Sequence, residues 1–117
     1  MSLLKHTKEA EMVSFEQFKE MEIKIGKVLE VEDVEGADRL YILTVDIGEE
    51  TRKIVAGIKL WYSREELVGK NVIVLANLQP RVIRGVESNG MVLATSNEDK
   101  FSVLTTDRDV PPGSRVS

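Results

Sequence analysis

Residues 23–56 read IKIGKVLEVEDVEGADRLYILTVDIGEETRKIVA, and this stretch decides the fold. Apolar and polar side chains alternate over 23–32, which predicts a strand with one mostly apolar face. That face would consist of Ile23, Ile25, Lys27, Leu29 and Val31. Residues 40–47 alternate in the same way, and the turn at Gly48 leads into a third strand over 52–56. The stretch therefore predicts a three-stranded meander.

Two more strands and a short helix follow the meander. Residues 71–76 and 91–95 are nearly unbroken apolar runs, which predicts two buried strands joined by a loop over 77–90. Ser63 and Glu66 have the spacing of a capping box, which predicts a short helix between the third and fourth strands. This order of elements is that of the five-stranded OB barrel, so the expected fold class is all-β.

A second capping box precedes the meander. Ser14 and Gln17 predict a short helix over about residues 15–21. Its apolar residues recur at helical spacing, so we expect them to form a buried stripe against the barrel. They are Phe15, Phe18 and Met21.

The rest of the chain falls outside these elements. Residues 1–13 carry no period and are predicted to form a tail, which leaves 14–117 as one OB-fold domain. Residues 97–117 form a C-terminal extension that the five strands do not need. Its apolar side chains predict an extra hairpin or a subunit contact, and with it a homodimer.

Composition narrows the functional classes. The chain has 117 residues and no cysteine, which excludes disulfides and thiolate metal sites and suits the cytoplasm. No apolar run is long enough for a membrane span or a signal peptide. His6 is the only histidine, and no Gly-rich phosphate loop occurs, so we expect no catalytic residues, metal site or cofactor.

Charge is distributed unevenly along the chain. The net charge is −4, yet residues 52–84 contain seven basic side chains and only two acidic ones. A local basic region can attract phosphate while the acidic remainder weakens indiscriminate binding. A solvated surface with chance asymmetry is the open alternative.

Six short motifs occur in order along the chain. They are EIKIGKV at 22–28, ADRL at 37–40, IVAGI at 54–58, EELVGK at 65–70, NLQP at 77–80 and SNGM at 88–91. Together, over about residues 14–117, they closely resemble the tRNA-binding domain family. Members of that family serve methionyl-tRNA synthetases as a C-terminal domain or a separate beta subunit, act as free-standing tRNA-binding proteins, or act as a secretion chaperone. The resemblance implies an OB barrel, usually a homodimer.

Basic residues are the first candidates for contacts with RNA. Arg81 and Arg84 lie in a loop bounded by proline and glycine, where guanidinium groups can reach phosphate oxygens or stack on unpaired bases. An ordinary solvated loop is the alternative. The secondary basic candidates are Arg39, Arg52, Lys53 and Lys59.

Three uncharged residues complete the candidate RNA-binding set. Asn77 and Ser88 offer donors and acceptors for sugars or base edges, although both residue types also form turns. The resemblance implies that Ser88 and Met91 lie at the RNA surface, while a core methionine remains an equal alternative. Gln79 and Val82 stand where lysine is frequent in the family. A family lysine often comes immediately before the aromatic pair Trp61–Tyr62, whereas here Lys59 is separated from that pair by one residue. We expect these departures to weaken RNA binding or to shift its footprint.

The predicted function is a non-catalytic module that binds folded tRNA and raises the tRNA affinity of a methionyl-tRNA synthetase catalytic subunit. Few aromatic side chains are free to stack on successive bases, which favours recognition of folded tRNA over generic single strands. Two alternatives stay open: a homodimeric peptide-binding export chaperone of the same family, and a dimerisation scaffold with residual RNA affinity.

Overall fold

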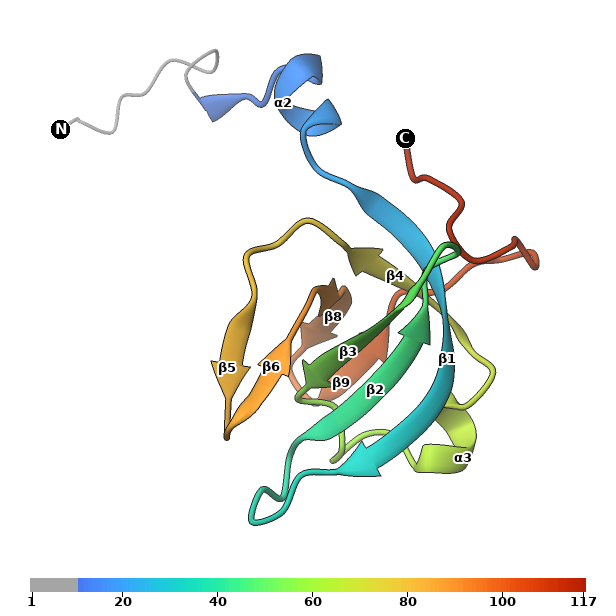
Figure 1. Cartoon of the computed structure of the whole chain (residues 1–117). Coiled ribbons are helices and arrows are strands. Elements are labelled where there is room, and N and C mark those ends of the chain that lie inside the picture. Colours follow the sequence, from blue (N-terminus) through green and yellow to red (C-terminus); the bar gives the residue numbers. More distant parts are fainter. Residues whose placement is uncertain (1–10) are drawn as a thin grey trace, which may run out of the picture.

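The computed structural model describes residues 11–117. In chain order its elements are α2 (Phe15–Lys19), β1 (Ile23–Asp33), β2 (Tyr41–Asp46), β3 (Thr51–Ala56), α3 (Arg64–Leu67), β4 (Asn71–Leu75), β5 (Arg81–Ile83), β6 (Val86–Ser88), β7 (Met91–Val92), β8 (Ala94–Asn97) and β9 (Lys100–Val103). Figure 1 shows the strands curling around one another, with α2 standing off at one end.

Five strands form an antiparallel barrel in the order β3-β2-β1-β4-β7. The two ends of this order approach each other: two residues before β7, the Asn89 N–H donates to the carbonyl oxygen of Lys53 in β3 over 2.9 Å. The predicted meander and the all-β OB-type fold are confirmed. The barrel interior is filled mainly by aliphatic side chains, and its fully buried large residues are Leu43, Ile47, Ile54, Leu67, Val28, Val45, Val72 and Val74.

The predicted apolar face of the first strand is wrong at Leu29, although Val31 further along the same face is buried as predicted. The pairing of β1 with β2 shifts register between Val28 and Glu30, so Leu29 is an unpaired bulge residue. Val28 is fully buried, whereas Leu29 is 42% exposed. One extra residue reverses the side-chain alternation, and regular alternation could not predict where it lies.

Both capping boxes are confirmed, but the buried stripe on α2 is not. The side-chain oxygen of Ser14 accepts from the Gln17 N–H over 3.1 Å, and the Ser63 oxygen accepts from the Glu66 N–H over 3.2 Å. No residue of α2 is buried: Phe15 is 67% exposed, and Phe18 is only partly covered. Met21, just beyond the helix, is also exposed. The stripe has no partner because α2 projects away from the barrel (Figure 1).

The segment after β4 differs from the prediction in two places. Residues 91–95 do not form one buried strand, since β7 ends at Val92 and every residue of β8 is exposed. The predicted loop over 77–90 contains a β-hairpin formed by β5 and β6. A hairpin of β8 and β9 is present, but it begins at Ala94, so only its second strand lies wholly within the predicted C-terminal extension.

The linker between α2 and β1 is held from two sides. The Asn77 amide donates to the Glu20 carbonyl oxygen over 2.7 Å and accepts from the Glu22 N–H over 2.9 Å. The Arg115 guanidinium donates to the carbonyl oxygens of Lys19 and Met21. Residues 20–22, here called the clamped linker, are therefore fixed to both the barrel and the C-terminal segment. Within residues 11–117 no helix has the length and apolar character needed to span a membrane.

Candidate nucleic-acid interface

The β5–β6 hairpin is closed by a two-residue turn at Arg84 and Gly85. Ile83 pairs with Val86 across it, and the two central residues have φ of 53° and 80°. Positive φ at both positions is the pattern of a type I′ turn, whose right-handed twist matches that of the flanking strands. This turn favours Asn-Gly, and arginine tolerates the left-handed conformation poorly. Arg84 is therefore presented at the hairpin tip at some conformational cost.

A pocket of about 340 Å³ lies between the hairpin tip and the loop that connects β1 to β2. We call it the Arg39–Arg84 pocket, and its lining residues are Gly36, Ala37, Asp38, Arg39, Leu40 and Arg84. Its loop side is fixed because the Arg39 carbonyl oxygen accepts from the Lys59 N–H over 3.2 Å. The fold thus brings together two predicted site residues that are 45 positions apart in sequence.

Carboxylates engage three of the basic candidates: Arg52, Lys53 and Lys59. Arg52 pairs with Glu50 at 2.8 Å, and Lys53 pairs with Glu32 at 3.3 Å. Arg52 also donates to the Ala76 carbonyl oxygen over 2.9 Å, which ties β3 to the end of β4. The acidic first half of the chain therefore neutralises much of the basic segment in space.

Asp33 accepts two cationic side chains at the end of β1. Lys59 Nζ lies 3.0 Å from one carboxylate oxygen, and the Arg64 guanidinium donates to the other. Hydrogen bonds from Lys59 and Arg64 lower the pKa of the Asp33 carboxyl below its ordinary value of 3.8. Lys59 also lies 5.8 Å from the centroid of the Tyr41 ring. These pairings join α3 and the preceding segment to the barrel.

Arg39, Arg81 and Arg84 form no ion pair within residues 11–117. Arg39, Arg81 and Arg84 are all exposed. Unpaired guanidinium groups retain all their donors for a ligand, and phosphate oxygens are suitable acceptors. These three arginines are therefore the basic candidates that are most available to bind an anion.

Two of the uncharged candidates hold the structure together. Asn77 fastens the clamped linker through both ends of its amide. Ser88 is 3% exposed, and its hydroxyl oxygen accepts from the Val55 N–H over 2.9 Å. The expectation that Ser88 lies at the surface is therefore wrong, because its hydroxyl attaches β6 to β3. Met91 does reach the surface, with 37% of its area exposed.

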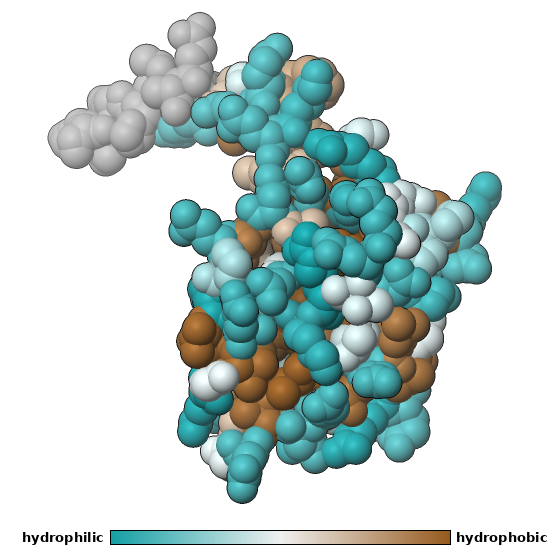
Figure 2. Space-filling model, viewed as in Figure 1, coloured by the Kyte–Doolittle hydropathy of each residue, from teal (hydrophilic) through white to brown (hydrophobic). Residues whose placement is uncertain are grey.

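Apolar side chains gather over the β5–β6 hairpin, as the brown region of Figure 2 shows. Val82 is 72% exposed, and Ile83 and Val86 are half-buried. Such a surface beside arginine can support an unstacked base or an apolar peptide side chain. Asp38 lines the Arg39–Arg84 pocket but was not among the residues predicted from the sequence, although its position beside Arg39 in the ADRL motif was a usable signal.

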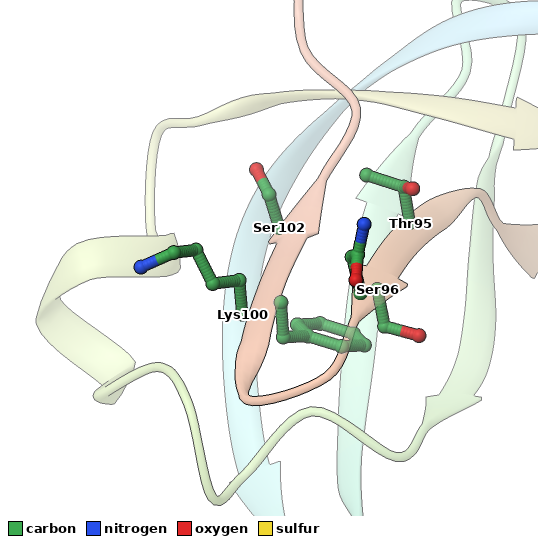
Figure 3. A pocket seen from close by; sticks show the side chains of 6 residues that line it. Thr95, Ser96, Lys100 and Ser102 are labelled. Carbon is green, nitrogen blue, oxygen red and sulfur yellow. The ribbon is translucent and has the colours of Figure 1, made fainter.

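Two other hollows lie elsewhere on the molecule. One, of about 270 Å³, is formed by the β8–β9 hairpin, and Figure 3 shows Thr95, Ser96, Lys100 and Ser102 around it. Phe101 also lines this hollow, and its ring stacks on Trp61 with centroids 4.3 Å apart. The second, of about 410 Å³, lies between the segment around α2 and the end of β4. Among the described residues no group of three or more His, Cys, Asp or Glu side chains could hold a metal ion.

Comparisons with known proteins identify the family of this chain. Residues 23–115 match the family described as "Putative tRNA binding domain". The methionine–tRNA ligase of Thermococcus kodakarensis is 45% identical over 112 residues, which are 96% of this chain and 15% of the ligase. The chain thus spans less than one fifth of the length of the curated relatives it matches.

Two solved structures have the same fold over nearly their whole length. The MetRS-related protein from Pyrococcus horikoshii has a TM-score of 0.84 at 36% identity, covering 91% of this chain and 98% of that one. The chaperone CsaA from Bacillus anthracis has a TM-score of 0.82 at 27% identity, covering 91% of this chain and 99% of that one.

Proposed function

Because the chain belongs to the tRNA-binding domain family, we propose that it binds folded tRNA through the β1–β2 loop and the β5–β6 hairpin, as a binding module rather than a catalyst. The observation that carries this proposal is that Arg39 and Arg84 line the same pocket. Neither arginine has an ion-pair partner among the described residues. In OB barrels these two connections flank the surface that binds oligonucleotides. Phosphate contacts from arginine suit recognition of RNA shape.

The test is a pair of double variants with the same change in charge. Replacing Arg81 and Arg84 by alanine should weaken tRNA binding and flatten the log-log dependence on salt by about one to two units, because each lost phosphate contact removes a little under one. Lys100 and Arg108 do not line the Arg39–Arg84 pocket. Their double alanine variant should therefore bind nearly as the parent does, in filter binding or fluorescence anisotropy.

Two results would contradict the proposal. One is equal loss of affinity in both double variants, which would mean that only net charge matters. The other is equal competition by an unstructured oligonucleotide of the same length as the tRNA, because a shape-reading surface should prefer the folded molecule.

We further propose that this binding serves a methionyl-tRNA synthetase in the cytoplasm by raising its tRNA affinity. The support is the similarity to a segment of methionine–tRNA ligases. Supplying the chain to the synthetase catalytic subunit should lower KM for tRNA while leaving kcat nearly unchanged, as expected when binding alone is strengthened. If KM for tRNA is unchanged while the chain still binds tRNA, the chain is a tRNA-binding protein that does not serve this synthetase.

A homodimer formed through the segment around α2 is part of the same proposal. Met12, Val13, Phe15 and Met21 are all exposed beside a hollow that Leu75 and Leu78 line. Phe15→Glu should produce monomers in sedimentation at micromolar concentration, whereas Val82→Glu, on the distant hairpin, should leave the dimer intact. A monomeric parent protein would remove the dimer from the proposal.

Peptide binding is the second candidate function. It is favoured by the apolar surface over the hairpin, where Val82 is 72% exposed, and by the similarity to a chaperone structure. Apolar peptide binding should respond to salt weakly or in the sense opposite to tRNA binding. If the chain binds an apolar peptide regardless of salt and has no measurable affinity for tRNA, peptide binding is its function.

A further inference from the structure

We propose that the Arg39–Arg84 pocket holds a single unstacked guanine nucleotide, with its phosphate between the two guanidinium groups and its base against Asp38. The inference rests on the proposed function and names the nucleotide that this site selects. It starts from the composition of the pocket, which joins two arginines and one aspartate on a lining otherwise made of Gly36, Ala37 and Leu40.

The size of the pocket limits what it can hold. Sites for small molecules occupy about 300–1,000 Å³, and this pocket, at about 340 Å³, lies at the lower end. One nucleotide is therefore the largest unit of RNA that suits it, and a run of stacked bases is too large. Gly36, with φ of 78°, has no side chain on the loop side and nothing within 4 Å of where a Cβ would lie, so a flat base can approach closely.

The charges in the pocket are not satisfied by one another. Asp38 lines the same pocket as Arg39 and Arg84, yet it forms no ion pair with either within residues 11–117. Asp33, by contrast, is held by two cations. The Asp38 carboxylate is thus an acceptor beside two donors, an arrangement that complements a ligand carrying both an anion and hydrogen-bond donors.

Guanine is the base that fits this arrangement. Its Watson–Crick edge presents the N1–H and the exocyclic amine side by side, so one carboxylate can accept both in a bidentate pair. Adenine and cytosine each offer the carboxylate a single amine, and uracil offers a single ring N–H. A bidentate contact discriminates between bases by about 5- to 150-fold, so a modest but measurable preference is expected at an exposed site.

Arg84 adds a second, independent observation. It occupies a turn position with φ of 53°, where asparagine would be favoured. Residues held in unfavoured conformations cluster at ligand clamps, and here the turn places Arg84 in the lining of the pocket.

The experiment is NMR titration of the isotope-labelled full chain with GMP, AMP, CMP and UMP, with inorganic phosphate as a control. GMP should shift the amide resonances of residues 36–40 and 84–85 and bind about five- to tenfold more tightly than AMP. Asp38→Asn should abolish this preference. Glu35→Gln is the matched control, because it removes the same charge from an exposed position of the same loop outside the pocket lining.

The direction of change separates two roles of Asp38. If the carboxylate only repels phosphate, Asp38→Asn tightens all four nucleotides equally, and the inference is overturned. If it accepts hydrogen bonds from guanine, only GMP loses its advantage. Equal shifts from the four nucleotides, with tRNA still bound by the parent chain, overturn the guanine site and leave the proposed function standing. Failure of the parent chain to bind tRNA overturns both.

Discussion

Replacing Arg84 by asparagine is expected to stabilise the protein and to weaken its binding to tRNA at the same time. Arg84 has φ of 53° in a turn whose second residue is Gly85. For most L-residues the left-handed conformation costs about 1–2 kcal/mol, and asparagine adopts it more readily. Relief of about half that strain gives 0.5–1 kcal/mol, which for a domain of this size raises Tm by roughly 2–5 °C.

The loss of binding follows from the same substitution. Arg84 forms no ion pair within residues 11–117, so its removal leaves no partner charge behind. One charge-assisted phosphate contact at an exposed site contributes about 1 kcal/mol, which is roughly a fivefold change in Kd. Differential scanning fluorimetry measures the stability, and anisotropy with labelled tRNA at two salt concentrations measures the affinity.

Two control variants separate turn geometry from charge. Arg84→Lys keeps the charge and should neither stabilise the turn nor remove the salt dependence. Arg81→Asn makes the same chemical change on the extended strand β5, where asparagine has no conformational advantage, so affinity should fall without a rise in Tm. A lower Tm for Arg84→Asn, or unchanged tRNA affinity, would refute the reasoning.

Three further predictions concern stability. Asp33→Asn should lower Tm at neutral pH, because the charged carboxylate stabilises the folded protein. The difference in Tm between parent and variant should fade as the pH falls below 3.8 and through the lowered pKa of Asp33 in the folded protein, which thermal melts across that range measure. Gly26→Ala should destabilise by about 1–3 kcal/mol in denaturant unfolding, since its Cβ would lie 2.5 Å from a Val45 methyl group; an unchanged midpoint would contradict this packing. Ser88→Ala should lower the free energy of unfolding by about 1–3 kcal/mol, because the buried Val55 N–H loses its acceptor. An unaltered midpoint in chemical denaturation would contradict the contribution of that hydrogen bond.

Local signals in the sequence were sufficient for most of the fold. The capping boxes at Ser14 and Ser63 use residues three apart, so their hydrogen bonds depend on the local chain alone. The bulge at Leu29 depends on pairing with a strand elsewhere, and the exposure of Phe15 depends on where α2 points. Neither is encoded in a local pattern.

The site was less predictable than the fold, since it depends on contacts between distant residues. From the sequence, the basic side chains of residues 52–84 were all candidates for binding phosphate. In the structure, Glu32 and Asp33 of β1 form ion pairs with Lys53 and Lys59. The amide of Asn77 is engaged by the clamped linker, 55 residues away. Only the folded chain distinguishes arginines that remain free from those that carboxylates already engage.

The clamped linker gives α2 the mechanical character of a fixed arm. Hydrogen bonds from Asn77 and Arg115 hold both sides of the linker, so the direction of the arm is set by the barrel. In a dimer joined through α2, the distance between the two proposed RNA-binding surfaces would then be fixed. Two such faces strengthen binding only when their separation matches two sites on one RNA molecule. Loosening the arm, for example with Asn77→Gly, should widen the range of RNA shapes that one dimer can bridge.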